Sequence, residues 1–175
     1  MSKRFILCLL VLYNSVLIIA QKPTDFVNPF INGLLNTLSM MAQTELRSGK
    51  PKLKDDELAR GDISGVIGMV GPQIKSSLSI TFEEPLALHV MQQMLGESVT
   101  ELNADVTDMV GEITNMICGS AKNELSDKGY EFNMATPAVI TGKNHTINHL
   151  VDGPKVILPF DCKHGRAFIE ICFNK

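Results

Sequence analysis

The chain has 175 residues, of which 45% are hydrophobic and 20% are charged, a composition typical of one globular domain with a sizeable core. Lys3, Arg4 and Lys22 lie in the first 22 positions, so the rest of the chain carries 13 basic and 19 acidic residues. An acidic domain without a stripe of basic and aromatic residues is a poor binder of nucleic acid. The composition therefore favours a protein or a small molecule as the partner.

The first 22 residues have the order of a signal peptide or of a short membrane anchor. Lys3 and Arg4 precede a mostly apolar run at residues 5–20. This run is shorter than a comfortable membrane span of about 20 residues, and no small-x-small cleavage triplet lies near Ala20. We favour a start codon assigned too far upstream or an accessory segment. We therefore expect a cytoplasmic protein, with export or membrane anchoring as alternatives, and a single domain at 26–174.

The cysteine residues show no spacing typical of a metal site. Cys118, Cys162 and Cys172 are irregularly spaced, and the chain contains no Cys-x-x-Cys pattern; a single His-x-x-x-His spacing occurs, at His145 and His149. We expect free thiols, as in a reducing compartment, and neither a metal nor a cofactor in this chain.

The domain is predicted to begin with a helix. Asn28 is a good N-cap and Pro29 suits the first helical position, and apolar residues at helical spacing continue to about residue 47. The charged stretch 52–60 is expected to be a solvated connection.

A β-hairpin is predicted next. Residues 63–70 and 74–82 have the pattern of two strands, joined by a turn at Gly71-Pro72. The spacing of Gly65, Gly68 and Gly71 resembles that of a nucleotide-binding loop. No helix and no Gly-Lys-Ser/Thr follows them, so we do not favour that interpretation.

The second half of the domain predicts two helices and then three strands. Glu84-Pro85 opens one helix that Gly96 ends, and a longer helix is capped by Asn103 and stops at Gly129. The expected strands are 137–141, 155–160 and 167–173. This order predicts an α+β domain in which a mainly antiparallel sheet is packed with helices.

The longer helix, from residue 104 to about 128, has two distinct faces. The face expected to pack on the sheet carries Val106, Val110, Ile113, Ile117 and Ser120. The opposite face carries a continuous polar row at spacings of four, three and four, formed by Asp108, Glu112, Asn115 and Gly119. Spacing alone also fits a solvated helix face.

Two glycines border this row, Gly111 and Gly119. A glycine inside a helix costs roughly 0.5–1 kcal/mol relative to alanine. Their position beside an acidic residue and an amide suggests that the backbone of another molecule approaches closely.

The segment from Gly111 to Gly119 resembles the Glu-x-x-Asn segment of the CheX and CheC phosphatases. The resemblance extends to Asn28-Pro29-Phe30-Ile31, to the hairpin and to the segment from Thr136 to Gly142, and it covers about residues 26–174. CheC proteins carry two Glu-x-x-Asn segments, whereas this chain has one. It is therefore more similar to CheX.

This resemblance implies a CheC/CheX-like fold and a phosphatase of two-component signalling, in chemotaxis or a related pathway. The substrate would be the aspartyl phosphate of a CheY-like response regulator. Asn115 would orient the attacking water, Glu112 would pair with the regulator's lysine, and Asp108, Gly111 and Gly119 would lie at the docking surface. Mg²⁺ is expected in the regulator. The alternative is a non-catalytic adaptor that binds a regulator or a flagellar switch component.

A homodimer is the expected oligomeric state, because CheX, which this chain resembles, associates through its sheet. Ile169, Ile171 and Phe173 predict an apolar terminal strand that needs a partner.

Overall fold

The computed structural model of this protein describes residues 25–96 and 98–173. The prediction on residues 1–22 and the last residue of the predicted domain lie outside the described residues. The helices in these ranges are an N-terminal helix at 25–42, α2 (Glu84–Leu95) and α3 (Ala104–Asp127). The strands are β1 (Arg47–Ser48), β2 (Lys52–Lys54), β3 (Ile63–Val70), β4 (Lys75–Phe82), β5 (Asn133–Met134), β6 (Ala138–Thr141), β7 (Lys155–Cys162) and β8 (Gly165–Phe173). None of the described helices is both long and apolar enough to span a membrane.

The strands form one antiparallel sheet in the order β1-β7-β8-β4-β3-β5. β2 also pairs with β7, and β6 also pairs with β3. The predicted hairpin is confirmed, since β3 and β4 pair from Ile63↔Phe82 to Val70↔Lys75. The predicted α+β class with a mainly antiparallel sheet is therefore also confirmed.

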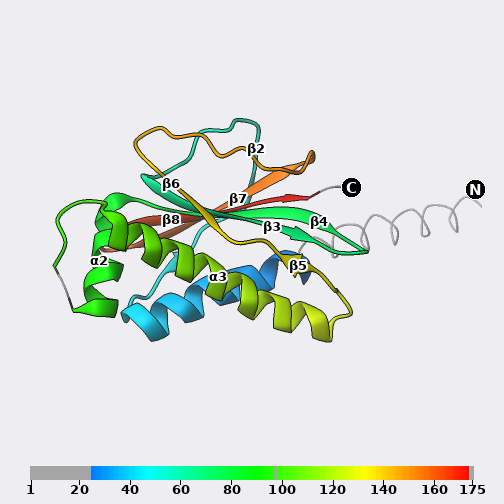
Figure 1. The fold of residues 1–175 in the computed structure, drawn as a ribbon, viewed down its shortest axis with the longest axis horizontal. Helices are drawn as coiled ribbons and strands as arrows, with labels where there is room; N and C mark the ends of the chain where they lie inside the picture. Colours follow the sequence, from blue (N-terminus) through cyan, green and yellow to red (C-terminus); the bar gives the residue numbers. More distant parts are fainter. Residues whose placement is uncertain (1–24, 97, 174–175) are drawn as a thin grey trace, which may run out of the picture.

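The helices and the loops cover opposite faces of this sheet. Figure 1 shows the N-terminal helix and α3 on one face, with α2 at one end of α3. The segment around β2 and the segment between β6 and β7 lie on the other face (Figure 1), and the bridge Leu58↔Thr146 joins these two segments. The main core lies between helices and sheet and includes the fully buried Phe30, Ile80 and Val110.

Glycines let α3 approach its neighbours closely. A Cβ atom on Gly65 of β3 would lie 2.0 Å from Thr114 Oγ1 of α3, and one on Gly33 would lie 3.0 Å from the Ile117 carbonyl oxygen. A larger residue at Gly65 would push α3 away from the sheet, because the interior is close-packed. This contact accounts for Gly65 without any nucleotide site.

The face opposite the helices carries a buried ion pair. Lys54 Nζ lies 2.7 and 2.8 Å from the two carboxylate oxygens of Glu170, and both side chains are 1% exposed. His149 Nε2 lies 3.7 Å from Glu170 Oε2, and His149 Nδ1 is hydrogen-bonded to Ser77 Oγ at 2.9 Å. These contacts fasten β2 and the segment that contains His149 onto β8 and β4.

The first helix ends earlier than the sequence predicts. It stops at residue 42 and not near 47, because Gln43 adopts a left-handed conformation with φ of 47° and Thr44 N donates to the Leu38 carbonyl at 3.0 Å. A helix that ends in a left-handed residue usually has glycine at that position. Glutamine there leaves no signal in the sequence.

The predicted solvated connection at 52–60 is partly wrong. It contains β2, which pairs with β7, and it contributes the buried Lys54. Charged residues are normally exposed. Lys54 is buried because its ammonium group pairs with the Glu170 carboxylate.

The predicted reason for a dimer is also wrong. β8 is not an apolar terminal strand at an edge, because it lies between β4 and β7. Ile169 and Ile171 are fully buried within the chain and need no partner. A dimer therefore requires a different surface.

Candidate functional site

α3 begins and ends with the capping residues that the sequence predicts. The Asn103 side chain accepts a hydrogen bond from Val106 N at 3.0 Å, which satisfies one of the free amides of the first turn. Gly129 follows the last turn with a φ of 84°, a conformation that favours glycine. These caps hold a helix whose two faces differ in chemistry.

The buried face of α3 is rotated slightly from the predicted one. Ser120 is exposed, and Thr114 is fully buried where it faces Gly65. Its hydroxyl donates to the Val110 carbonyl at 2.7 Å, so the buried polar group is satisfied. The polar row remains on the outside, and Asp108, Glu112 and Asn115 are all exposed.

Most of the polar row opens into one groove, which we call the polar groove, with a volume of about 640 Å³. One wall consists of Thr107, Asp108, Gly111, Glu112 and Asn115 of α3, and the other consists of Met134, Ala135, Thr136, Pro137 and Val139. The structure therefore brings four of the five predicted site residues together. Gly119 lies one turn further along α3 and is not in the groove lining.

Packing inside the chain requires neither Gly111 nor Gly119. A Cβ atom on Gly111 would make an ordinary contact of 3.5 Å with Val139 Cγ2, and one on Gly119 would have no atom of another segment within 4 Å. Both positions accept alanine sterically, in contrast to Gly65. The fold by itself gives no reason for these two glycines.

The second wall was not predicted as part of the site. The signal for it is present, since the segment from Thr136 to Gly142 contributes to the resemblance to CheX. Position in the sequence did not show that this segment lies beside α3, because its placement depends on pairing of β5 and β6 with β3.

The described residues contain no group of three or more His, Cys, Asp or Glu side chains that could hold a metal ion. Cys118, Cys162 and Cys172 are free. Burial raises the pKa of the Cys118 thiol, which keeps it protonated. Cys118 is therefore not a candidate nucleophile, although it is close to Asn115 in the sequence.

The family model for chemotaxis phosphatase CheX matches residues 63–161, which include α3 and both walls of the polar groove. The chain belongs to the CheX family. This result confirms the resemblance found in the sequence and the CheC/CheX-like fold.

Relatives of this CheX-family protein include solved structures. The structure of a CheC-like superfamily protein from Shewanella sp. PV-4 is 62% identical, with 86% of this chain and 98% of that chain covered and a TM-score of 0.82. The structure of a CheX-CheY-BeF3-Mg²⁺ complex from Borrelia burgdorferi contains a chain that is 25% identical, with 86% and 98% covered and a TM-score of 0.73.

A further relative is the CheY-P phosphatase CheX of Thermotoga maritima. It is 27% identical over 119 residues, which span 67% of this chain and 76% of that protein.

Proposed function

We propose that this CheX-family protein hydrolyses the aspartyl phosphate of a CheY-like response regulator. The observation that carries the proposal is that Glu112 and Asn115 are both exposed, one turn apart, at one open groove. The matching relative from T. maritima, a CheY-P phosphatase, supports the same reaction. The B. burgdorferi complex supports a CheY-like protein as the partner.

In this proposal Asn115 orients the attacking water and Glu112 fixes the docking pose. Hydrolysis of an acyl phosphate requires a water held in line and stabilisation of the developing charge, with little covalent help. The amide of Asn115 has both a donor and an acceptor and therefore holds water without changing its protonation state. The Glu112 carboxylate pairs with a lysine of the regulator. In this proposal Mg²⁺ belongs to the regulator.

The test is phosphate release from phosphorylated CheY-like regulators with and without this protein, in the presence of Mg²⁺. We expect faster release from at least one regulator and negligible hydrolysis of small phosphate esters, because docking of a folded partner supplies the alignment. Binding to the phosphorylated regulator without faster release would instead indicate the non-catalytic adaptor.

Asp108, Gly111 and Gly119 are proposed to lie under the docked regulator. Gly119→Ala should raise the free energy of unfolding by about 0.5–1 kcal/mol, because the site has room for a methyl group and alanine favours the helix. The same change should raise the apparent KM for the phosphorylated regulator, because it adds a methyl group to the docking surface. Denaturant titration and steady-state kinetics measure the two effects.

Ser120→Ala is the matched control for this prediction. It lies beside Gly119 on α3 and is exposed, and it raises helix propensity without adding an atom. If Gly119→Ala stabilises the fold and leaves KM at the wild-type value, Gly119 does not lie at the docking surface.

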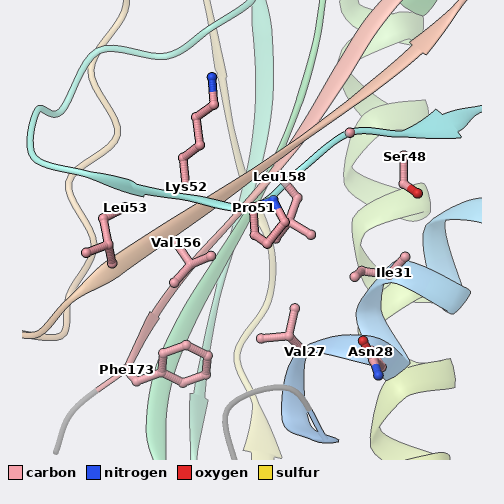
Figure 2. Close-up of a pocket in the computed structure, with 11 residues that line it drawn as sticks. Val27, Asn28, Ile31, Ser48, Pro51, Lys52, Leu53, Val156, Leu158 and Phe173 are labelled. Carbon is pink, nitrogen blue, oxygen red and sulfur yellow. The ribbon is translucent and has the colours of Figure 1, made fainter. Parts of the chain in front are cut away.

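We further propose a homodimer that covers a second, apolar groove of about 440 Å³. Figure 2 shows Val27 and Ile31 of the N-terminal helix on one side of this groove and Val156 and Phe173 of the sheet on the other. Leu53 of β2, also in the lining, is 78% exposed. An exposed apolar groove beside an edge strand favours association with a second copy.

Leu53→Asp should convert the dimer to a monomer, because a carboxylate in an apolar interface loses its hydration. Multi-angle light scattering at micromolar concentration measures this change. Leu150→Asp is the matched control, since Leu150 is 92% exposed and lies outside the groove. A wild-type protein that is monomeric at every concentration would exclude the dimer.

The proposed substrate places the protein in the cytoplasm, where response regulators act. Cell fractionation should recover it with the cytoplasmic proteins. Recovery with membranes or outside the cell would instead favour a retained anchor or an export signal in residues 1–22.

A further inference from the structure

The second wall of the polar groove is an edge strand with a bulge. The pairing Met69↔Met134 of β5 changes to Val66↔Ala138 in β6, so three residues, 135–137, lie opposite two residues of β3. One extra residue on one strand is a β-bulge, a feature that is common beside active sites. The bulge residues line the polar groove opposite α3.

The register determines where the backbone groups of β6 point. Gly142 N donates to the Asp62 carbonyl at 2.9 Å, which is the bond that flanks a non-hydrogen-bonded pair, here Ile63↔Thr141. Such pairs alternate along an antiparallel ladder, so Ile140 bonds toward β3 while Val139 and Thr141 point away from it. In the described residues β6 pairs with β3 alone, and the N–H and C=O groups of Val139 and Thr141 therefore lie on the open edge.

Pro137 and the bulge protect only part of this edge. Proline is tolerated at a sheet edge because it has no N–H to leave unpaired, and a bulge disrupts further pairing. Val139 and Thr141 lie beyond this segment, and each keeps an outward-pointing N–H and C=O group. The edge next to the polar groove is thus available as a template for one more strand.

The charges on the α3 wall determine which kind of segment can bind beside this edge. The charged residues among the described lining of the polar groove are Asp108 and Glu112, both acidic. Val139 is close to α3, since its Cγ2 atom lies 3.5 Å from the position of a Cβ on Gly111. A molecule that brings its phosphate to Asn115 therefore lies close to this edge, and an acidic wall favours a neutral or basic segment.

We propose that an extended, neutral or basic segment of the response regulator pairs with the open edge of β6 while its aspartyl phosphate faces Asn115. The inference rests on the proposed function and names the way in which the partner is held. Main-chain hydrogen bonds to Val139 and Thr141 supply affinity, as in other cases of strand addition, and the α3 wall supplies specificity.

Proline substitution tests the outward-pointing amides one at a time. Thr141→Pro and Val139→Pro remove an N–H that β3 does not use, so both should fold, whereas Ile140→Pro removes a ladder bond and should lower the melting temperature. Each outward proline should raise the KM for the phosphorylated regulator, and the Kd for its beryllium fluoride form, about tenfold with kcat nearly unchanged. Thr141→Ala, which keeps the N–H, should raise KM far less than Thr141→Pro.

Hydrogen exchange of the wild-type protein gives a readout that does not depend on the variants. Adding the beryllium fluoride form of the regulator should slow exchange at the Val139 and Thr141 amides and leave the Ile140 amide, already paired, almost unchanged. Folded proline variants with wild-type KM, or unprotected Val139 and Thr141 amides in a saturated complex, would overturn the inference. If the proline variants fail to fold, the exchange experiment decides.

If the proposed function is wrong, these experiments should give a different set of results. A wild-type protein that binds the regulator and protects these amides without releasing phosphate would contradict the phosphatase while supporting the strand pairing. A wild-type protein that binds no regulator would contradict both.

Discussion

Asn115→Ala should lower the turnover of regulator dephosphorylation about 10²-fold, the scale for losing one positioned polar group in a transition state. The side chain is exposed, so the free energy of unfolding should stay within about 0.5 kcal/mol of wild type. Binding to the phosphorylated regulator should persist, because the proposed role of Asn115 is to orient water. Single-turnover phosphate release and a binding titration measure the two quantities separately.

Asn123→Ala is the matched control. Asn123 is also an exposed asparagine of α3, and it lies outside the polar groove. Glu112→Ala should differ from both variants by raising the apparent KM as well, since loss of the proposed ion pair weakens the complex. Near wild-type turnover in Asn115→Ala would show that another residue positions the water, or that the regulator dephosphorylates itself.

Glu170→Gln should lower the free energy of unfolding by about 3–5 kcal/mol, the cost of leaving a buried charge without its partner. Glu170 and Lys54 are both buried, and the carboxylate binds the ammonium group through both oxygens. Loss of this ion pair should increase local unfolding of β2 before the rest of the sheet, because Lys54 is the buried side chain of β2. Urea denaturation measures the free energy, and hydrogen exchange at β2 measures the loosening.

The exposed pair Lys128–Glu124 provides the control for this effect. Its side chains are 40% and 41% exposed, so Glu124→Gln should cost no more than about 1 kcal/mol. The double variant Lys54→Met/Glu170→Leu should recover most of the loss, because no unpaired charge remains. A Glu170→Gln protein as stable as wild type would mean that the Lys54 ammonium finds water or another partner.

The local patterns of the sequence predicted the longest elements well. α3 begins after Asn103 and ends before Gly129, as expected from its caps, and the hairpin follows its predicted bounds to within one residue at the start of β4. These features depend on neighbours a few positions apart, namely a helical or alternating repeat and the residue that caps it. The candidate site could be predicted from the sequence for the same reason, since the polar row lies on a single helix.

Short strands and long-range pairs were not predicted. β1, β2 and β5 contain two or three residues each, too few for a periodic signal. Glu170 alternates with Ile169 and Ile171, a pattern that predicts exposure. It is buried because segments from elsewhere in the chain cover that face of the sheet.

The α+β class, the helix that carries Glu112 and Asn115, and the resemblance to CheX could all be predicted from the sequence, because each depends on residues close together in the chain. The three-dimensional fold was needed to show that β8 lies inside the sheet, that Lys54 is buried, and that the bulge at 135–137 lines the polar groove opposite α3. These features depend on which distant strands pair and in which register. Register is set by packing of the whole sheet against its helices, and no local window contains that information.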